Sequence, residues 1–155
     1  DFSDPYYTSE LVVVVKKDGP YAKAASLADL SGAKITGQLN TFHYTVIDQI
    51  PGVKKETAMD TFPAMIVALQ SGKIDGYVSE RPGALSATAA NPELSFVQFG
   101  DDKGFQASEE DVAISVGLKK GSKLRDQINQ ILAGISVDKR EQMMLDALNN
   151  QPLSQ

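Results

Sequence analysis

The sequence predicts an α/β fold, and two features of its patterning support this prediction. Short apolar segments of strand length alternate along the chain with segments of helical length, an order typical of helices packed against a sheet. Glycine, proline and asparagine separate these segments at the positions where turns are expected. Hydrophobic residues make up 42% of the 155 residues and charged residues 23%. The chain therefore has enough apolar material for the core of an ordinary globular domain.

Composition excludes several classes of function. The 20 acidic and 15 basic residues give a net charge of −5, which argues against a nucleic-acid partner. The chain has no cysteine and one histidine, so a thiolate nucleophile, a disulfide framework and a Cys-based or His-rich metal site are excluded. The longest apolar run, residues 11–15, has the length of a strand and not the roughly 18 residues of a membrane span. We find no phosphate-binding glycine loop, and we expect no cofactor and no metal.

Strands and helices are expected in alternation through the first half of the chain. The β-branched run Leu11–Val15 predicts a strand buried on both faces, and Ser26 is placed to cap a short helical turn over residues 27–30. A second strand is expected over residues 34–39. Asn40 then predicts the N-cap of a helix over residues 41–50, since asparagine is a favoured N-cap residue.

The middle of the chain repeats this order. A short strand is expected over residues 53–57, and Asp60 or Thr61 is placed to cap a helix that carries Pro63 in its first turn, where proline is tolerated. Gly72 ends that helix. The next strand, residues 74–78, precedes an alanine-rich helix over residues 82–90.

The last third predicts two strands and two helices. Strands are expected over residues 94–99 and 112–118, with a polar loop between them. Apolar residues spaced as on one face of a helix start at Leu124 and predict an amphipathic helix. A final helix is expected over residues 138–148, with a frayed tail after it.

The tripeptide Asn40-Thr41-Phe42 is the first candidate binding site. It lies between a predicted strand and a predicted helix, and the first turn of a helix offers unpaired N–H groups and a positive dipole end. Together these bind an anion such as a carboxylate, and the Thr41 hydroxyl adds a donor. The alternative is that these residues only cap the helix, which is their commoner role and the one that the local sequence favours.

Glu80 is the second candidate. It follows a predicted strand and precedes a helix, and in open α/β sheets ligands lie outside the carboxyl ends of the strands. A carboxylate there can pair with a ligand ammonium group. The local alternative is an acidic residue stabilised by a helix N-terminus. Taken together, an anion site at Thr41 and a carboxylate at Glu80 suit a zwitterion, for which free α-amino acids are the obvious class. The one histidine, His43, is more often structural or solvent-facing than catalytic in such a position.

Four segments, in this order, resemble motifs of a known family. They are Asp1-Phe-Ser-Asp-Pro-Tyr-Tyr7, Ser26-Leu-Ala-Asp-Leu-Ser-Gly-Ala-Lys-Ile35, Ala68-Leu-Gln-Ser-Gly-Lys-Ile-Asp-Gly-Tyr-Val78 and Ala113-Ile-Ser-Val-Gly-Leu-Lys-Lys-Gly121. The chain resembles the family 3 extracellular solute-binding proteins, which have the type II periplasmic-binding-protein fold and serve polar amino-acid ABC transporters.

The resemblance implies two α/β lobes that are joined by two crossing strands and close on a ligand like a hinge. It assigns residues 1–15 to the end of lobe 1 and the first hinge strand, 16–111 to lobe 2, 112–118 to the second hinge strand and 119–155 to the C-terminal helices of lobe 1. The family's first lobe begins some ninety residues before the segment that resembles Asp1–Tyr7. We therefore expect a truncated fragment with one complete three-layer α/β lobe and the C-terminal part of the other. Such a fragment would expose apolar helix faces, self-associate in a non-native way and bind ligand weakly.

The resemblance also implies site residues. In the family, a G-T/S-T loop takes the ligand carboxylate, and Asn40, Thr41 and Phe42 occupy that loop here. Asn40 stands where the family has glycine, and Phe42 replaces a small residue. Glu80 matches the family carboxylate that pairs with the ligand ammonium, although aspartate is commoner there. Gln38 occupies a strand-end position that reaches the ligand side chain in relatives.

The function implied is that of the substrate-binding component of an amino-acid ABC importer, which binds a free polar L-amino acid between two lobes and delivers it to the membrane permease. The protein would be extracytoplasmic, in the periplasm or at the cell surface, where it is free, lipid-anchored or permease-fused. It would not be an enzyme. Two alternatives stay open. One is a dehydratase or lytic enzyme on the same fold, for which His43 and Glu80 are the candidate acid and base. The other is the ligand-binding module of a sensory receptor.

Overall fold

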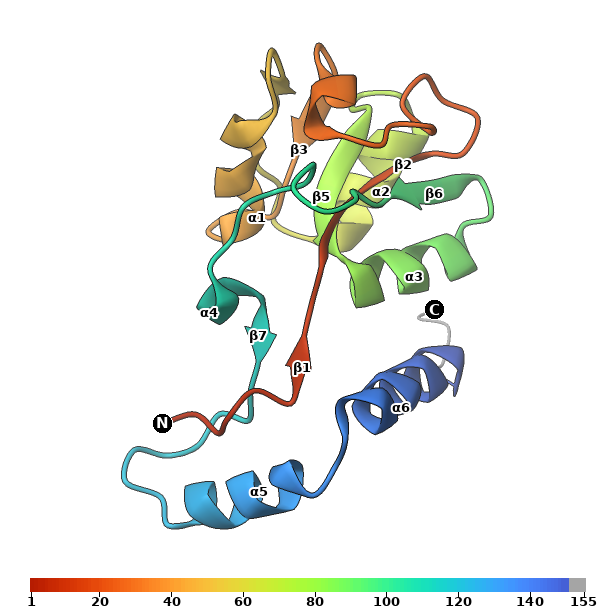
Figure 1. The fold of residues 1–155 in the computed structure, drawn as a ribbon. Coiled ribbons are helices and arrows are strands. Elements are labelled where there is room, and N and C mark those ends of the chain that lie inside the picture. The colour runs from red at the N-terminus through yellow and green to blue at the C-terminus, as the bar shows by residue number, and fades with distance from the viewer. Residues whose placement is uncertain (151–155) are drawn as a thin grey trace. The chain divides into compact units, whose positions relative to one another are not determined.

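The structure is a computed structural model that describes residues 1–150. The chain divides into two compact units: a smaller one made of Asp1–Ser9 and Ser108–Gln155, and a larger one, Glu10–Ala107. Each unit has its own sheet, with two strands in the smaller unit and five in the larger. Figure 1 shows the elements of both units.

The larger unit is built on a five-stranded mixed sheet with the strand order β4-β3-β5-β2-β6. Its strands are β2 (Leu11–Lys16), β3 (Lys34–Thr36), β4 (Lys54–Lys55), β5 (Gly76–Glu80) and β6 (Leu94–Val97). Strand β2 is antiparallel to both β5 and β6, while β3 is parallel to both β4 and β5. One strand therefore runs against the other four, and it lies inside the sheet.

Strand β2 is the centre of the core. Its first five residues are buried, as the continuous apolar run predicts. On one face, Val12 and Val14 pack with Tyr77 of β5 and with residues of α2 (Phe62–Gln70) and α3 (Arg81–Ala90). Thr61 caps α2 as predicted, since its hydroxyl accepts a hydrogen bond from the backbone N–H of Ala64.

The second face of the sheet is also covered. Gly76 lies under Val13 and Ile35, and a Cβ at that position would come within 2.8 Å of Val13 Cγ1 and 3.1 Å of Ile35 Cδ1. The helical turns on this side are η1 (Leu27–Leu30), α1 (Phe42–Thr45) and η2 (Val46–Gln49). Leu30 and Ile47, from two of these turns, are fully buried. We infer that the turns form the layer opposite α2 and α3, which completes a three-layer arrangement.

The smaller unit holds a short ribbon and three helices. Strand β1 (Tyr7–Thr8) pairs antiparallel with β7 (Ala113–Ile114), and the helices are α4 (Glu109–Val112), α5 (Leu124–Ala133) and α6 (Val137–Asn150). Arg140 of α6 donates hydrogen bonds to the carbonyls of Pro5 and Leu132. This arginine therefore ties α6 to α5 and to the N-terminal segment.

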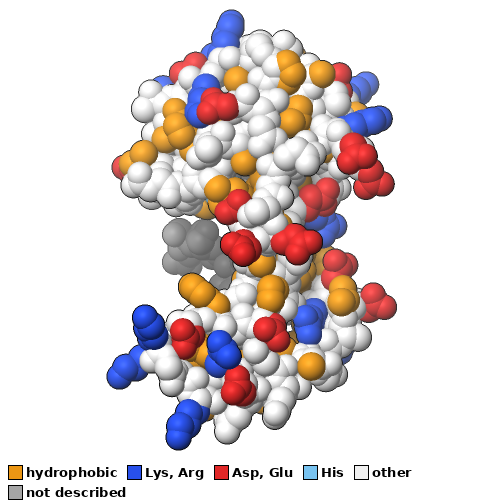
Figure 2. Space-filling view, turned by 60° about the vertical axis from the view of Figure 1, so that its left-hand side comes forward, with side chains coloured by type: hydrophobic (Ala, Val, Ile, Leu, Met, Phe, Trp, Pro, Cys, Tyr) orange, Lys and Arg blue, Asp and Glu red, His pale blue; other side chains and the backbone are white. Residues whose placement is uncertain are grey.

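Apolar side chains remain exposed on the smaller unit. Leu124 and Ile131 of α5 and Val137 of α6 are 55%, 67% and 71% exposed. Figure 2 shows apolar side chains among the charged ones at the surface. An apolar hollow of about 230 Å³ has a lining that includes Tyr6, Leu132 and Met143. Exposed apolar helix faces were expected here, and self-association through them stays a prediction.

The predicted elements follow one another in the expected order, but β1 and α4 lie in segments expected to be loops, and several details were wrong. The helix expected over residues 41–50 is one α-turn, α1, followed by the 3-10 turn η2. Thr45, Val46 and Ile47 are β-branched and form helix poorly, and the residue before Pro51 is pushed out of the helical region. The N-cap of α1 is Thr41 and not Asn40.

Other boundaries of the predicted strands and helices also differ from those in the structure. Strand β5 spans Gly76–Glu80, two residues beyond the predicted 74–78, and the expected strand 112–118 is reduced to the two residues of β7. Helix α6 runs to Asn150, so Asn149 is helical and not frayed. The remainder of the predicted tail lies outside the described residues.

The division into units differs from the expected segments at both ends of the larger unit, since residues 108–111, expected in lobe 2, fall in the smaller unit. Residues 11–15, expected to belong to a hinge strand, form the central strand of the larger unit. The assignment of lobes and hinge strands stays a prediction. Within residues 1–150, no helix combines the length and the apolar character needed to cross a membrane.

Replacing Gly76 by alanine tests the packing of the two faces. The new methyl group would meet Val13 and the carbonyl oxygen of Val14 at 2.8 and 2.9 Å, so Gly76→Ala should lower the free energy of unfolding by about 1–3 kcal/mol. Gly100→Ala is the control, because a Cβ there meets nothing within 4 Å and should change the value by less than about 0.5 kcal/mol. Urea unfolding followed by circular dichroism measures both, and equal midpoints would contradict the packing described.

Candidate functional site

Glu80 is held at the carboxyl end of β5. It pairs with Leu11 of β2 and also serves as the N-cap residue of α3, with φ −88° and ψ 151°. The next backbone N–H, that of Arg81, donates to the carbonyl of Glu10 at 2.8 Å. The Glu80 side chain is 28% exposed. The sheet therefore fixes the position of this carboxylate and leaves it partly open to solvent.

The turn before α1 has a special backbone. Asn40 has φ 60°, the left-handed region that glycine enters freely and asparagine more readily than most residues. Asparagine therefore keeps the turn that glycine would make. The Thr41 hydroxyl donates to the carbonyl of Gln38 at 2.8 Å and makes no cap bond to α1. Because α1 has four residues, its dipole contributes less to anion binding than the predicted ten-residue helix would.

His43 brings the two predicted halves of the site together. Its Nδ1 lies 3.1 Å from Thr41 Oγ1, and its Nε2 lies 3.6 Å from Glu80 Oε1. The residue is 9% exposed, and the ring of Phe42 stacks on the imidazole with centroids 4.4 Å apart. Thr41 and Glu80 thus flank one buried ring, although they are far apart in the sequence.

Two further neighbours shape this region. The Gln38 side chain donates to the carbonyl of Asp60 at 3.2 Å, so its amide contacts the segment before α2 and neither His43 nor Glu80. At Gly37 the strand end and α1 approach closely, and a Cβ there would lie 3.0 Å from the carbonyl carbon and oxygen of His43. Only glycine allows this approach without displacement of α1.

From the sequence, His43 was paired with Glu80 only as the candidate acid and base of an enzyme, and was not included among the ligand contacts. The signal in the sequence was weak: a histidine two positions after Thr41, in the first turn of a helix. Its contact with Glu80 spans 37 positions and cannot be read from local sequence. The roles of Thr41, Phe42, Glu80, Gln38 and Asn40 as ligand contacts stay predictions.

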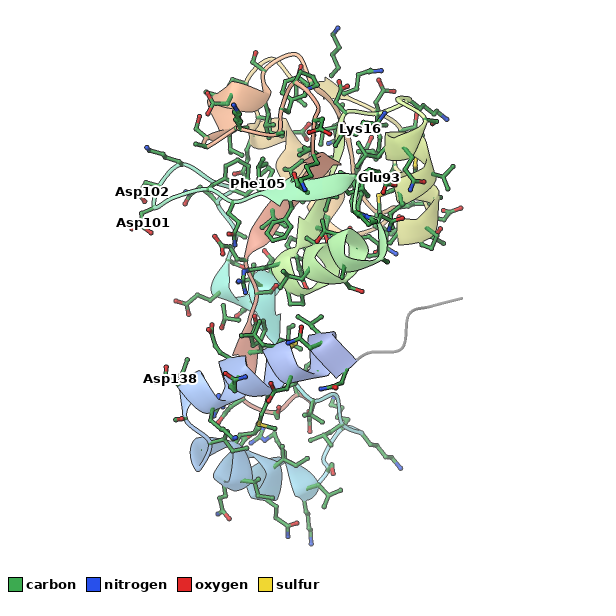
Figure 3. The ribbon with its side chains drawn as sticks, turned by 90° about the vertical axis from the view of Figure 1, so that its right-hand side faces the viewer. Lys16, Glu93, Asp101, Asp102, Phe105 and Asp138 are labelled. Carbon is green, nitrogen blue, oxygen red and sulfur yellow. The ribbon has the colours of Figure 1, made fainter. Side chains whose placement is uncertain are left out.

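Charge clusters outside this region do not form a metal site. Asp101 and Asp102 project outward at the tip of their loop (Figure 3). Across residues 1–150, no group of three or more acidic or histidine side chains is arranged to hold a metal ion.

Comparison with known proteins gives homologues along most of the chain. The ABC transporter arginine-binding protein 1 of Escherichia coli (strain K12) is 28% identical over 147 residues, which cover 94% of this chain and 57% of that protein. The probable histidine-binding protein of Campylobacter jejuni is 33% identical over 102 residues, 65% of this chain and 39% of that protein. This chain is a homologue of the amino-acid-binding proteins of ABC transporters. No protein-family model matches it.

Solved structures of such proteins share the fold. An ancestral arginine-binding protein bound to arginine is 29% identical, with a TM-score of 0.67, over 96% of this chain and 63% of that one. The predicted α/β fold of the type II periplasmic-binding-protein kind is thereby confirmed. The chain spans less than two thirds of the length of each of these proteins. All three are binding proteins by name, and none is named as an enzyme.

The conformation of Asn40 can be tested by a pair of substitutions. Asn40→Gly should keep the free energy of unfolding close to that of the wild type, because glycine accepts φ 60° without strain. Asn40→Val should lower it by about 1–2 kcal/mol, the usual cost of a left-handed residue with a Cβ. Urea unfolding measures the difference, and two variants of equal stability would contradict the assigned turn.

Proposed function

We propose that this chain acts in the substrate-binding component of an amino-acid ABC importer, which captures a free polar L-amino acid and delivers it to the membrane permease. The observation that carries the proposal is the pairing of Thr41 and Glu80 on either side of His43. Homology to proteins named for arginine and histidine binding supports it.

The two groups have the chemistry that opposite ends of an amino acid require. Glu80 is partly exposed, and its contact with His43, at 3.6 Å, is longer than a hydrogen bond. Its carboxylate can therefore accept hydrogen bonds from a ligand ammonium, which are among the stronger hydrogen bonds in proteins. The Thr41 hydroxyl, by rotating away from Gln38, and the backbone N–H of Phe42 would take the ligand carboxylate. Asn40 sets the turn, and Gln38 lies at its edge.

The rest of the proposal concerns the whole protein. Residues 16–111 would form lobe 2, residues 1–15 and 112–118 would supply the hinge strands, and residues 119–155 would belong to lobe 1. The protein would lie outside the cytoplasm, where it meets its amino acid and its permease. It would release the amino acid unchanged, so His43 and Glu80 would not act as a catalytic acid and base.

Titration with amino acids tests ligand capture. In ¹H–¹⁵N correlation spectra, L-arginine, L-histidine or L-glutamine should shift the backbone signals of Thr41, Phe42 and Glu80 in a saturable way. Agmatine, which lacks the carboxylate, and Nα-acetyl-arginine, which lacks the ammonium, should bind more weakly than L-arginine. Absence of saturable shifts at millimolar concentrations of all twenty amino acids would contradict the proposal, as would chemical conversion of a bound amino acid.

Glu80→Gln tests the ammonium contact directly. Loss of the charge should weaken L-arginine binding on the order of 10- to 100-fold, as removal of one partner of a partly buried charge pair does. Glu110→Gln is the matched control, since Glu110 lies exposed on α4 of the smaller unit. Calorimetry measures both affinities, and equal weakening in the two variants would count against a specific role for Glu80.

A further inference from the structure

His43 is a buried titratable side chain that the proposed ligand contacts do not use. It is 9% exposed, and its Nε2 is buried without a hydrogen-bond partner. Glu80 Oε1 lies 3.6 Å from this nitrogen. A buried polar nitrogen without a hydrogen-bond partner destabilises the folded protein. An interaction between the imidazole and the partly exposed Glu80 carboxylate would remove this cost.

The hydrogen atoms of the neighbouring groups determine which protonation state fits. The Thr41 hydroxyl has a single hydrogen, which it donates to the carbonyl of Gln38, so it can only accept from Nδ1 of His43. A neutral ring with its hydrogen on Nδ1 would then turn the lone pair of Nε2 toward the Glu80 carboxylate. A ring with hydrogens on both nitrogens donates toward Thr41 and Glu80 at once. The geometry around the imidazole therefore suits a ring with hydrogens on both nitrogens.

Glu80 is the charged group that lies next to the imidazole of His43. Among residues 1–150, it is the acidic or basic side chain in contact with the imidazole, which it reaches from the end of β5. Of the charged side chains on η2 and β4, Asp48 and Lys55 contact each other, with Lys55 Nζ 2.9 Å from Asp48 Oδ2, and Lys54 is exposed. On its own element, the ring is covered by the uncharged ring of Phe42.

We propose that His43 is a positioning residue that pairs with Glu80 when no ligand is bound, and that it releases a proton to solvent when a ligand ammonium binds Glu80. The inference rests on the proposed function, because it needs Glu80 as the ammonium contact. The ligand ammonium and the protonated imidazole compete for the Glu80 carboxylate. The coupling is reciprocal: ligand binding weakens the binding of the proton to His43, and protonation of His43 weakens ligand binding. Histidine changes its charge between about pH 5 and 8, so ligand affinity should fall as the pH is lowered through that range.

Calorimetry of L-arginine binding between pH 5.5 and 8, in buffers of different ionisation enthalpy, measures the protons released. The wild type should release up to about one proton per ligand and bind several-fold more weakly at pH 5.5 than at pH 8. His43→Gln retains an amide donor and acceptor but does not titrate, so it should bind without this proton release and with a flatter pH profile. His43 is the only histidine, and the variant also controls for titration of the ligand itself.

The outcomes separate the inference from the proposed function. Binding of L-arginine that depends on Glu80, with the same proton release and pH profile in wild type and His43→Gln, overturns the inference and leaves the function standing. Binding by Glu80→Gln at wild-type affinity overturns both.

A measurement without ligand tests the pairing itself. In ¹⁵N spectra of the single imidazole at pH 6.5, the doubly protonated ring should be more populated in the wild type than in Glu80→Gln. Equal populations overturn the inference, even if no amino acid binds or the His43→Gln variant does not fold.

Discussion

The larger unit depends on one strand that is buried on both faces and paired along both edges. Strand β2 joins β6 to β5, β3 and β4, so the sheet would fall into two parts without it. Because it is antiparallel to β5 with Leu11 opposite Glu80, the same pairing that completes the sheet also fixes where β5 ends. The register between β2 and β5 therefore determines both the packing of the core and the position of Glu80.

Much of this could be predicted from sequence because its signals are local. The β-branched run at residues 11–15 is too apolar for a strand with one solvent-facing side. Thr61 with Pro63 marks the start of a helix, and both features are found in α2. The position of Glu80 between a strand and a helix could also be predicted, because polar residues directly follow a segment that is apolar enough to be buried.

The site was harder to predict because its central contact is not local. His43 reaches Glu80 only after β3 and β5 align side by side, which brings α1 to the end of β5. Asparagine is favoured both as the N-cap of a helix and as the left-handed residue of a turn. The sequence alone therefore could not show that Asn40 takes the second role. The homologues share the fold and support the proposed class of ligand, while the role of each side chain stays a prediction from its geometry.

The absence of a side chain at Gly37 has a consequence for how such a site can diversify. Main chain touches main chain there, since a Cβ would lie 3.0 Å from the backbone of His43. The backbone that carries the imidazole thus lies directly against the peptide of Gly37, and a residue with a Cβ at position 37 would shift His43 relative to Glu80. In this chain, variation that leaves His43 in place is therefore restricted to positions other than 37.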